Sequence, residues 1–122
     1  MTDARQQLGK TGEDLAVREL ISRGYAILDR RYRTRHGEID IICEDHGTIV
    51  FVEVRAKGSG EFGSAAESVT SVKQRRVAAM AVDYLARRRL SHRPCRFDVV
   101  AIDKADDPAP QIAVYTNAFD AV

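Results

Sequence analysis

Two acidic residues lie inside apolar segments, where an uncompensated charge is costly. Asp40 lies within the segment GEIDIICE, and Glu53 lies within the still more apolar segment TIVFVEVR. A carboxylate that leaves water loses free energy unless a cation, a metal ion or hydrogen bonds compensate it. These two residues are therefore the first candidates for a site that does chemistry.

The segments that carry the two acids are predicted to be neighbouring strands. Residues 38–44 and 48–55 are rich in β-branched residues, and residues 44–47 between them form a predicted turn with Gly47 where a positive φ is favoured. The composition of the second segment is typical of a central strand that is covered on both faces. The pattern therefore predicts a hairpin with one deeply buried strand.

The hairpin brings Asp40 and Glu53 to similar heights on adjacent strands, with a one-residue bulge to complete the register. Because side chains alternate between the two faces of a strand, Glu38 shares a face with Asp40. For the same reason Arg55 and Lys57 share a face with Glu53. The predicted site thus holds two carboxylates, with cations two and four positions further along the second strand.

Adjacent carboxylates and a backbone carbonyl provide the hard oxygen ligands that Mg²⁺ and Mn²⁺ prefer. An ion bound there polarises a phosphodiester and provides a hydroxide at neutral pH. Arg55 or Lys57 would stabilise the negative charge that develops on phosphorus. The alternative is an ordinary ion pair between Glu53 and Arg55 or another arginine, and the spacing fits both interpretations.

Charge is unevenly distributed along the chain, although 19 Lys and Arg against 18 Asp and Glu give a net charge of only +1. Residues 37–72, which contain both acids, carry seven acidic and two basic residues (−5). Residues 18–36 carry six arginines and two acids (+4), and residues 73–96 carry eight bases and one acid (+7). An acidic centre repels DNA, so a nuclease needs positive flanks and a bound metal to attract phosphate. The distribution therefore favours a nucleic-acid partner.

The basic flanks supply the candidate phosphate-binding residues. Those expected to border the carboxylates are Arg31, Arg33, Arg35, Lys73, Arg75 and Arg76. Lys73 and Arg76 are one helical turn apart and share a face. The arginines at 87–89 are better explained as cations that complement the dipole at a helix end. Asp98, in a later apolar segment, is expected to form an ion pair with Arg96 or with a base of the second helix.

Hydrophobic periodicity predicts the remaining elements. Residues 3–23 and 71–90 predict amphipathic helices, and residues 25–32, 96–102 and 111–115 predict further strands, the last of them at an edge. The expected apolar stripes are Leu8, Leu15, Ala16, Leu20 and Ile21 in the first helix and Val72, Val77, Met80, Ala81, Tyr84 and Leu85 in the second. The order α-β-β-β-α-β predicts a three-layer α/β fold with a mixed central sheet.

Composition and length argue against several classes of protein. A chain of 122 residues with 44% hydrophobic residues suits one domain over 1–122, with a core of about 8–103 and an acidic segment at 104–122. Cys43 and Cys95 are isolated, which argues against a disulfide scaffold or a zinc ribbon. No apolar run approaches the ~18 residues of a membrane span and no signal peptide is evident, so a cytoplasmic location is expected.

The ordered set of segments resembles the PD-(D/E)xK nucleases of the restriction-endonuclease-like superfamily. The resemblance rests on the strand segment Gly37–Asp40 (GEID), a hairpin turn, and Phe51–Arg55 (FVEVR). Within that superfamily the chain resembles the YraN-like bacterial proteins, which are similar to archaeal Holliday-junction resolvases. The resemblance covers residues 8–103, and its further matching positions are Gly12, Glu13, Gly63, Glu67, Lys73 and the segment 96–100 (RFDVV).

The resemblance implies roles for particular residues of this chain. Glu13 matches an acid of the first helix that joins the metal shell in related nucleases. Asp40 and Glu53 match the strand acids, and the Val54 carbonyl is a further implied ligand. Arg55 stands at the motif lysine, where it keeps the positive charge and can clamp a phosphate but cannot act as a general base.

The substitution at the motif lysine leaves three alternatives open. The metal alone activates water, or Lys57 occupies the space of the lysine, or catalysis is weak or lost. The leading expectation is a Mg²⁺- or Mn²⁺-dependent nuclease that hydrolyses DNA phosphodiesters, with branched, Holliday-junction-like DNA and a homodimer expected by analogy. The alternatives are a nucleic-acid-binding protein that retains the nuclease fold without turnover, and an interaction domain whose charges are merely solvated.

Overall fold

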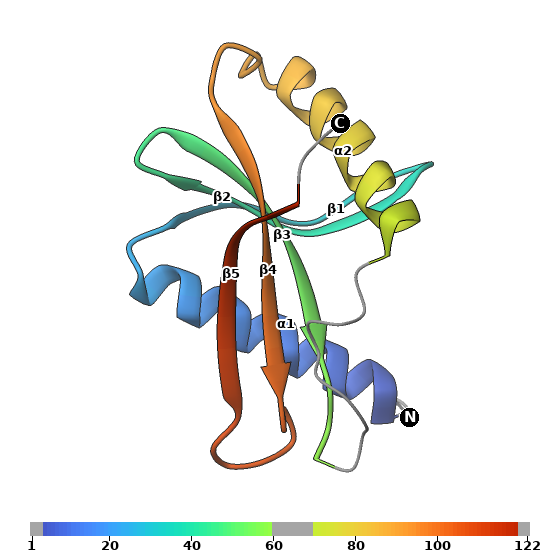
Figure 1. Ribbon diagram of the computed structural model, residues 1–122, viewed down its shortest axis with the longest axis vertical. Coiled ribbons are helices and arrows are strands. Elements are labelled where there is room, and N and C mark those ends of the chain that lie inside the picture. Colours follow the sequence, from blue (N-terminus) through green and yellow to red (C-terminus); the bar gives the residue numbers. More distant parts are fainter. Residues whose placement is uncertain (1–3, 60–69, 120–122) are drawn as a thin grey trace.

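A mixed five-stranded sheet forms the centre of the molecule, with one helix on each face (Figure 1). The computed structural model describes residues 4–59 and 70–119. Along the chain the elements are α1 (Ala4–Ser22), β1 (Ala26–Thr34), β2 (Gly37–Asp45), β3 (Thr48–Ala56), α2 (Ser71–Arg87), β4 (Cys95–Asp103) and β5 (Gln111–Phe119). This order confirms the predicted three-layer α/β architecture, including the last strand at the edge.

The strands lie in the sheet in their chain order, β1 to β5. The pairs β1–β2, β2–β3 and β4–β5 are antiparallel, and β3–β4 is parallel. A parallel pair needs a long crossover, and α2 lies within the crossover between β3 and β4. The β2–β3 hairpin closes through His46 and Gly47, whose φ angles of 47° and 90° are those that a two-residue hairpin loop requires.

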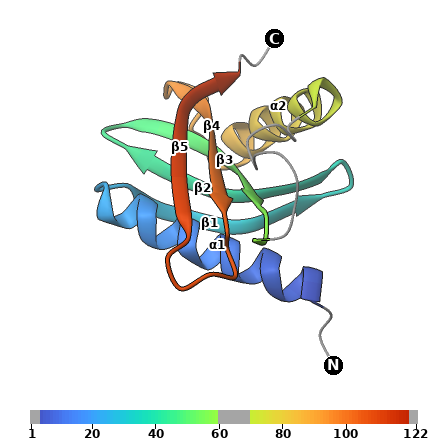
Figure 2. The ribbon, with the colours of Figure 1, turned by 60° about the horizontal axis from the view of Figure 1, so that its bottom comes forward.

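Each helix packs on its own apolar core, so the sheet is buried on both faces (Figure 2). Under α2, Met80 and Tyr84 pack with Phe51 of β3. Under α1, Leu20 packs with Val52, the next residue of the same strand. Adjacent residues of β3 thus enter opposite cores, which confirms it as a central strand covered on both faces.

The structure corrects the sequence predictions at several positions. The apolar stripes of the helices were expected to include Ile21 and Val72, but these residues are 56% and 49% exposed. Leu20, in the same turn as Ile21, is fully buried, so Ile21 lies outside the buried face of α1. The second helix ends at Arg87 rather than at residue 90, and the last strand extends to Phe119 rather than 115. The β2–β3 register runs without a shift from Asp45–Thr48 to Ile41–Val52, so the predicted bulge is absent from this paired stretch.

Gly12 of α1 disfavours a helix by itself, but it has a packing role. A Cβ atom at this position would lie 2.6 Å from Cβ of Ala56 at the end of β3. The missing side chain therefore lets α1 approach the sheet closely beside Glu13, which is the next residue. Gly63 and Glu67, two further positions of the family resemblance, lie outside the described residues. Neither α1 nor α2 has the length and apolar character that a membrane crossing requires.

Candidate metal centre and basic groove

The two strand acids lie where β2 and β3 part from each other. The ladder between these strands runs from Asp45–Thr48 to Ile41–Val52. Beyond it, Asp40 Oδ2 accepts a hydrogen bond from the backbone N–H of Val54 at 2.8 Å, so a side chain replaces the next backbone partner. Continuing the same register by one residue places Asp40 opposite Glu53, as predicted but without a bulge.

A group of three carboxylates gathers at this opening in the sheet. Glu13 from α1 and Glu38 and Asp40 from β2 each offer an oxygen atom, and these atoms lie within 4.8 Å of one another. Carboxylate oxygens at such spacing are the ligands that hard divalent cations prefer. The group contains two of the three predicted metal ligands and adds Glu38, whereas Glu53 is not a member of it.

Glu53 lies beside this group and is 3% exposed. Its Oε1 atom contacts Nζ of Lys73 and lies 3.6 Å from Nη1 of Arg55. Among the described residues, the same oxygen is a buried side-chain atom that receives no hydrogen bond of normal geometry. An ion pair therefore compensates part of its charge, as the alternative interpretation of the sequence expected, but its hydrogen-bonding capacity is left unused.

The surroundings of Asp40 favour its protonated form. Burial, followed by the nearby negative charge of Glu53, raises the pKa of Asp40 to about 7. The hydrogen bond from Val54 and the charge of Lys73 act in the opposite direction, but they do not outweigh these causes. A cation bound beside Asp40 would favour its ionised form.

Glu13 is held in place by two arginines of β1. It is 7% exposed, and Arg30 donates to its Oε1 from Nε and Nη2 at 3.2 and 3.1 Å. Nε of Arg31 lies 3.2 Å from each carboxylate oxygen. Arg31, which was expected to bind nucleic acid, thus has an acidic partner within the protein, and so does Arg30, which the sequence prediction left out of the site.

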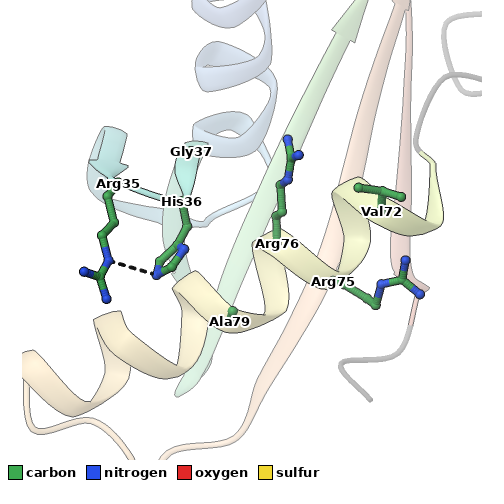
Figure 3. A pocket seen from close by; sticks show the side chains of 7 residues that line it. All are labelled: Arg35, His36, Gly37, Val72, Arg75, Arg76 and Ala79. Atoms are coloured by element: carbon green, nitrogen blue, oxygen red, sulfur yellow. Dashed lines mark hydrogen bonds between the residues drawn. The ribbon is translucent and has the colours of Figure 1, made fainter.

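Next to the carboxylates, three adjoining depressions of about 620, 600 and 440 Å³ run along α2 and the β1–β2 hairpin. We call this surface the basic groove. Its arginine, lysine and histidine lining residues are Arg33, Arg35, His36, Lys73, Arg75, Arg76 and Arg87, and its acidic lining residues are Glu38, Asp40 and Asp83. Figure 3 shows Arg35 and His36 on the hairpin and Arg75 and Arg76 on α2, around the largest depression.

The basic groove and the acidic group share one end. The 440 Å³ depression of the basic groove is lined by Glu38 and Asp40 as well as by Lys73 and Arg76. Of the predicted nucleic-acid-binding residues, the groove therefore brings together all except Arg31. Arg33 lines it and also pairs with Glu38, with Nε 3.1 Å from Oε2.

Lys57 lies beyond the end of β3. Its backbone N–H donates to the carbonyl of Ile102, and its own carbonyl accepts from Ala105, both at 2.9 Å. These bonds attach the segment to the end of β4, and Lys57 is not among the residues that line the basic groove. Its predicted role as a substitute for the motif lysine stays a prediction.

The sequence prediction places Glu38, Arg30 and His36 beside the site but assigns none of them a metal-binding or catalytic role. Glu38 carried a usable signal, because it was already placed on the same strand face as Asp40. His36 carried a weaker one, since it lies between an arginine and the glycine that starts β2. No local pattern indicated that Arg30 would reach Glu13, because that contact depends on how α1 crosses β1.

Comparison with known proteins identifies the family of the chain. A family model described as Uncharacterised protein family UPF0102 matches residues 12–102. The chain is 45% identical to a UPF0102 protein of Anaeromyxobacter dehalogenans, with 97% of this chain and 87% of that protein covered. It is 42% identical to a UPF0102 protein of Symbiobacterium thermophilum (95% and 98% covered) and 50% identical to one of Persephonella marina (92% of each).

The matched residues include Glu13, Asp40, Glu53 and Lys73, and therefore the acids of the site together with its principal cation. The described fold, with its mixed sheet between two helices, is consistent with the nuclease-like architecture that the sequence motifs implied. The chain belongs to the UPF0102 family, in agreement with its YraN-like sequence motifs.

Proposed function

We propose that this protein is a metal-dependent nuclease that binds DNA and hydrolyses its phosphodiesters. The observation that carries the proposal is a set of buried carboxylates with incomplete compensation at the end of a basic groove. Glu53 has a buried oxygen without a hydrogen bond, and Asp40 has a raised pKa. Such a combination is costly for the folded protein, and it is typical of sites that bind a cation or do chemistry.

The donor set fits Mg²⁺ or Mn²⁺, with Glu13, Asp40 and Glu53 as proposed ligands and Glu38 as an additional one. All the side-chain donors are carboxylates, which these hard cations prefer over imidazole or thiolate. The buried Oε1 atom of Glu53, which contacts Lys73 but receives no hydrogen bond of normal geometry, supports this fit. When bound, such a cation supplies a nucleophilic hydroxide at neutral pH and polarises the phosphoryl oxygen.

The residues of the basic groove then bind and orient the DNA. Arg35, Arg75 and Arg76 provide charges along a path that leads to the carboxylates. Arginine suits this task because its planar guanidinium can bind a phosphate through two parallel hydrogen bonds. Arg55 is proposed to hold Glu53 in place, since its Nη1 atom lies 3.6 Å from Oε1 of that carboxylate.

A second function is favoured by the same contacts. Lys73 and Arg55 already pair with Glu53, so the carboxylate has cationic partners without any metal. A protein that binds nucleic acid without cleaving it would keep the basic groove and use these ion pairs to maintain the fold. This second candidate predicts binding that weakens with salt and no metal-dependent cleavage.

Branched DNA and a homodimer remain parts of the proposal that rest on the resemblance to junction resolvases. A two-fold dimer matches the two related strands of a four-way junction. Sedimentation equilibrium tests the dimer, since one chain has a mass of 13.6 kDa. Comparing a four-way junction with a linear duplex of the same sequence tests the preference for branched DNA.

The experiment that tests the proposed function is cleavage of labelled junction and duplex DNA in Mg²⁺, Mn²⁺ or EDTA. We expect cleavage with either metal, none in EDTA, and a loss of about 10²–10³-fold or more in Glu53→Gln and Asp40→Asn. Lys10→Ala is the control, because Lys10 is an exposed base of α1 outside the site. Unchanged cleavage in both acidic-site variants would exclude the assigned site, and binding without cleavage by the wild type would favour the second function.

A further inference from the structure

The side chain of Lys73 reaches from α2 to the buried carboxylate of β3. Its Nζ contacts Oε1 of Glu53, the oxygen that has no hydrogen bond of normal geometry. Arg55 approaches the same oxygen from its own strand, with Nη1 at 3.6 Å. Lys73 is therefore the nearer of the two cations that pair with Glu53 in the described structure.

The helix itself does not favour a lysine at this position. Thr70 is the N-cap of α2, and its hydroxyl accepts a hydrogen bond from the backbone N–H of Lys73 at 3.2 Å. Lys73 is thus the third residue of the helix, where glutamate or glutamine can reach back to the cap. A cation in the first turn also opposes the helix dipole. Lys73 is therefore explained by its partners across the groove rather than by the helix.

Lys73 also borders the space that a phosphate would enter. Its side chain is 35% exposed, and it lines the 440 Å³ depression together with Glu38 and Asp40. The ammonium and two of the carboxylates thus border the same space, which a phosphate would enter. An ammonium is a compact charge with three rotatable donors, whereas the guanidinium of Arg55 has donors in a fixed plane. Lys73 can therefore follow a phosphate oxygen as its geometry changes.

We infer that Lys73 is a catalytic residue of the proposed nuclease, and that its ammonium group stabilises the negative charge that develops on the scissile phosphate. The inference rests on the proposed function and deepens it, because the lysine comes from α2 while the motif position on β3 holds Arg55. In this step Lys73 exchanges the carboxylate of Glu53 for a phosphate oxygen. Arg55 remains with Glu53 and keeps it in position.

The reaction balances without a change in the protonation of Lys73. The oxygen of a water molecule adds to phosphorus while the bond between phosphorus and one sugar oxygen breaks. The proton of the water passes to solvent, and the leaving sugar oxygen takes up a proton from solvent. Lys73 acts only through its charge and its hydrogen bonds to the phosphate, which are worth most in the transition state.

Steady-state cleavage of labelled DNA in Mn²⁺ separates this role from simple phosphate binding. We expect Lys73→Ala to lower kcat by about 10²–10³-fold with little change in KM, and Lys73→Arg to recover part of the loss. Arg76→Ala is the matched comparison from the same helix face and groove, and it should raise KM while kcat changes little. Lys10→Ala should leave both parameters unchanged.

Binding measurements that do not depend on cleavage complete the test. Mn²⁺ binding by electron paramagnetic resonance should be as tight or tighter in Lys73→Ala, because the removed ammonium no longer competes for Glu53. Normal kcat in this variant would overturn the inference and leave Lys73 as a counter-ion. A rise in KM alone would overturn it in favour of a phosphate contact. If Lys73→Ala does not fold, Lys73→Met retains the apolar stem and repeats both measurements.

The proposed nuclease function and the proposed role of Lys73 can be disproved separately. A wild-type protein that cleaves no DNA with any divalent cation removes the proposed function, and the inference about Lys73 falls with it. A wild-type protein that cleaves DNA while Lys73→Ala retains full kcat removes only the inference about Lys73.

Discussion

Two buried acids on neighbouring strands have opposite surroundings. Asp98 of β4 pairs in register with Val52, and Glu53 is the next residue of β3, so the two acids lie one residue apart in the sheet. Asp98 is fully buried and accepts from Arg96 Nε at 3.1 and 3.3 Å and from the backbone N–H of Asn117 at 2.9 Å. Glu53 is almost as buried, but its Oε1 receives no hydrogen bond of normal geometry.

The partner of Asp98 makes further polar contacts of its own. Arg96 also donates to Asp45 at 3.0 Å and to the hydroxyl of Tyr25 at 2.8 Å, and its guanidinium lies over the ring of Tyr25. Burial lowers the pKa of Arg96, but the hydrogen bonds to the two carboxylates outweigh burial and raise it. This network joins the segment after α1 to β2 and β4. Both regions therefore bury an acid. The candidate site differs because the carboxylate of Glu53 lacks the hydrogen bonds of normal geometry that the carboxylate of Asp98 receives.

The largest expected effect comes from breaking the satisfied network. Arg96→Met leaves Asp98 and Asp45 without their shared cation, and we expect the free energy of unfolding to fall by about 3–5 kcal/mol. Equilibrium urea unfolding measures this loss. Arg23→Ala is the control, because Arg23 forms an exposed pair with Glu19 at 2.9 Å and should cost less than about 1 kcal/mol. A loss as small as that of the control would show that Arg96 does not stabilise the buried acids.

A substitution of Asp40 is expected to raise the free energy of unfolding, by a smaller amount than Arg96→Met lowers it. The pKa of Asp40 rises from 3.8 to about 7 on folding, because burial and Glu53 disfavour its charged form. Stability due to the protonated carboxyl is thus complete below pH 3.8 and is lost as the pH rises towards 7. Asp40→Asn keeps an acceptor for the Val54 N–H and carries no charge. We therefore expect it to be more stable than the wild type by about 1–2 kcal/mol at pH 8 and equal to it near pH 4.

Thermal unfolding over this pH range, with and without Mg²⁺, tests the prediction for Asp40. Added Mg²⁺ should stabilise the wild type at pH 8 and leave Asp40→Asn nearly unchanged, because binding to the folded state adds stability. The matched control is Asp98→Asn, which should be less stable than the wild type at pH 8. If Asp40→Asn were also less stable than the wild type at that pH, the charge of Asp40 would be as well compensated as that of Asp98, and the proposed contrast between the two acids would be wrong.

The sequence alone was enough to locate the strand acids, because their signals are local. β-branched segments on both sides of a glycine turn predict the hairpin, and strand alternation places Glu38 with Asp40. The predicted bulge follows from a hairpin turn that closes at residues 45–46. The loop consists of His46 and Gly47, both with positive φ, and that register leaves no residue over.

The partners that lie on the same strand were predictable, namely Arg96 for Asp98 and Arg55 for Glu53. Partners from distant elements were not, because they depend on how those elements pack. Lys73 meets Glu53 only because α2 crosses the face of the sheet near the end of the β2–β3 ladder. Arg31 was assigned to DNA from its position in a basic run, but α1 brings Glu13 within 3.2 Å of it. Charge runs in sequence identify a basic surface, while the fold decides which of its members remain available to a ligand.

The smallest expected effect separates arginines of the basic groove from arginines of the buried network. Arg35 lies in the turn between β1 and β2, lines two depressions of the groove and donates to the ring of His36 at 3.5 Å. Arg35→Ala should change stability by less than about 0.5 kcal/mol and weaken DNA binding, with the slope of log K against log salt reduced by about 1. Fluorescence anisotropy at several salt concentrations measures that slope. Because Arg23 is equally removable but lies outside the groove, Arg23→Ala should keep the wild-type slope, and equal slopes in the two variants would remove Arg35 from the binding surface.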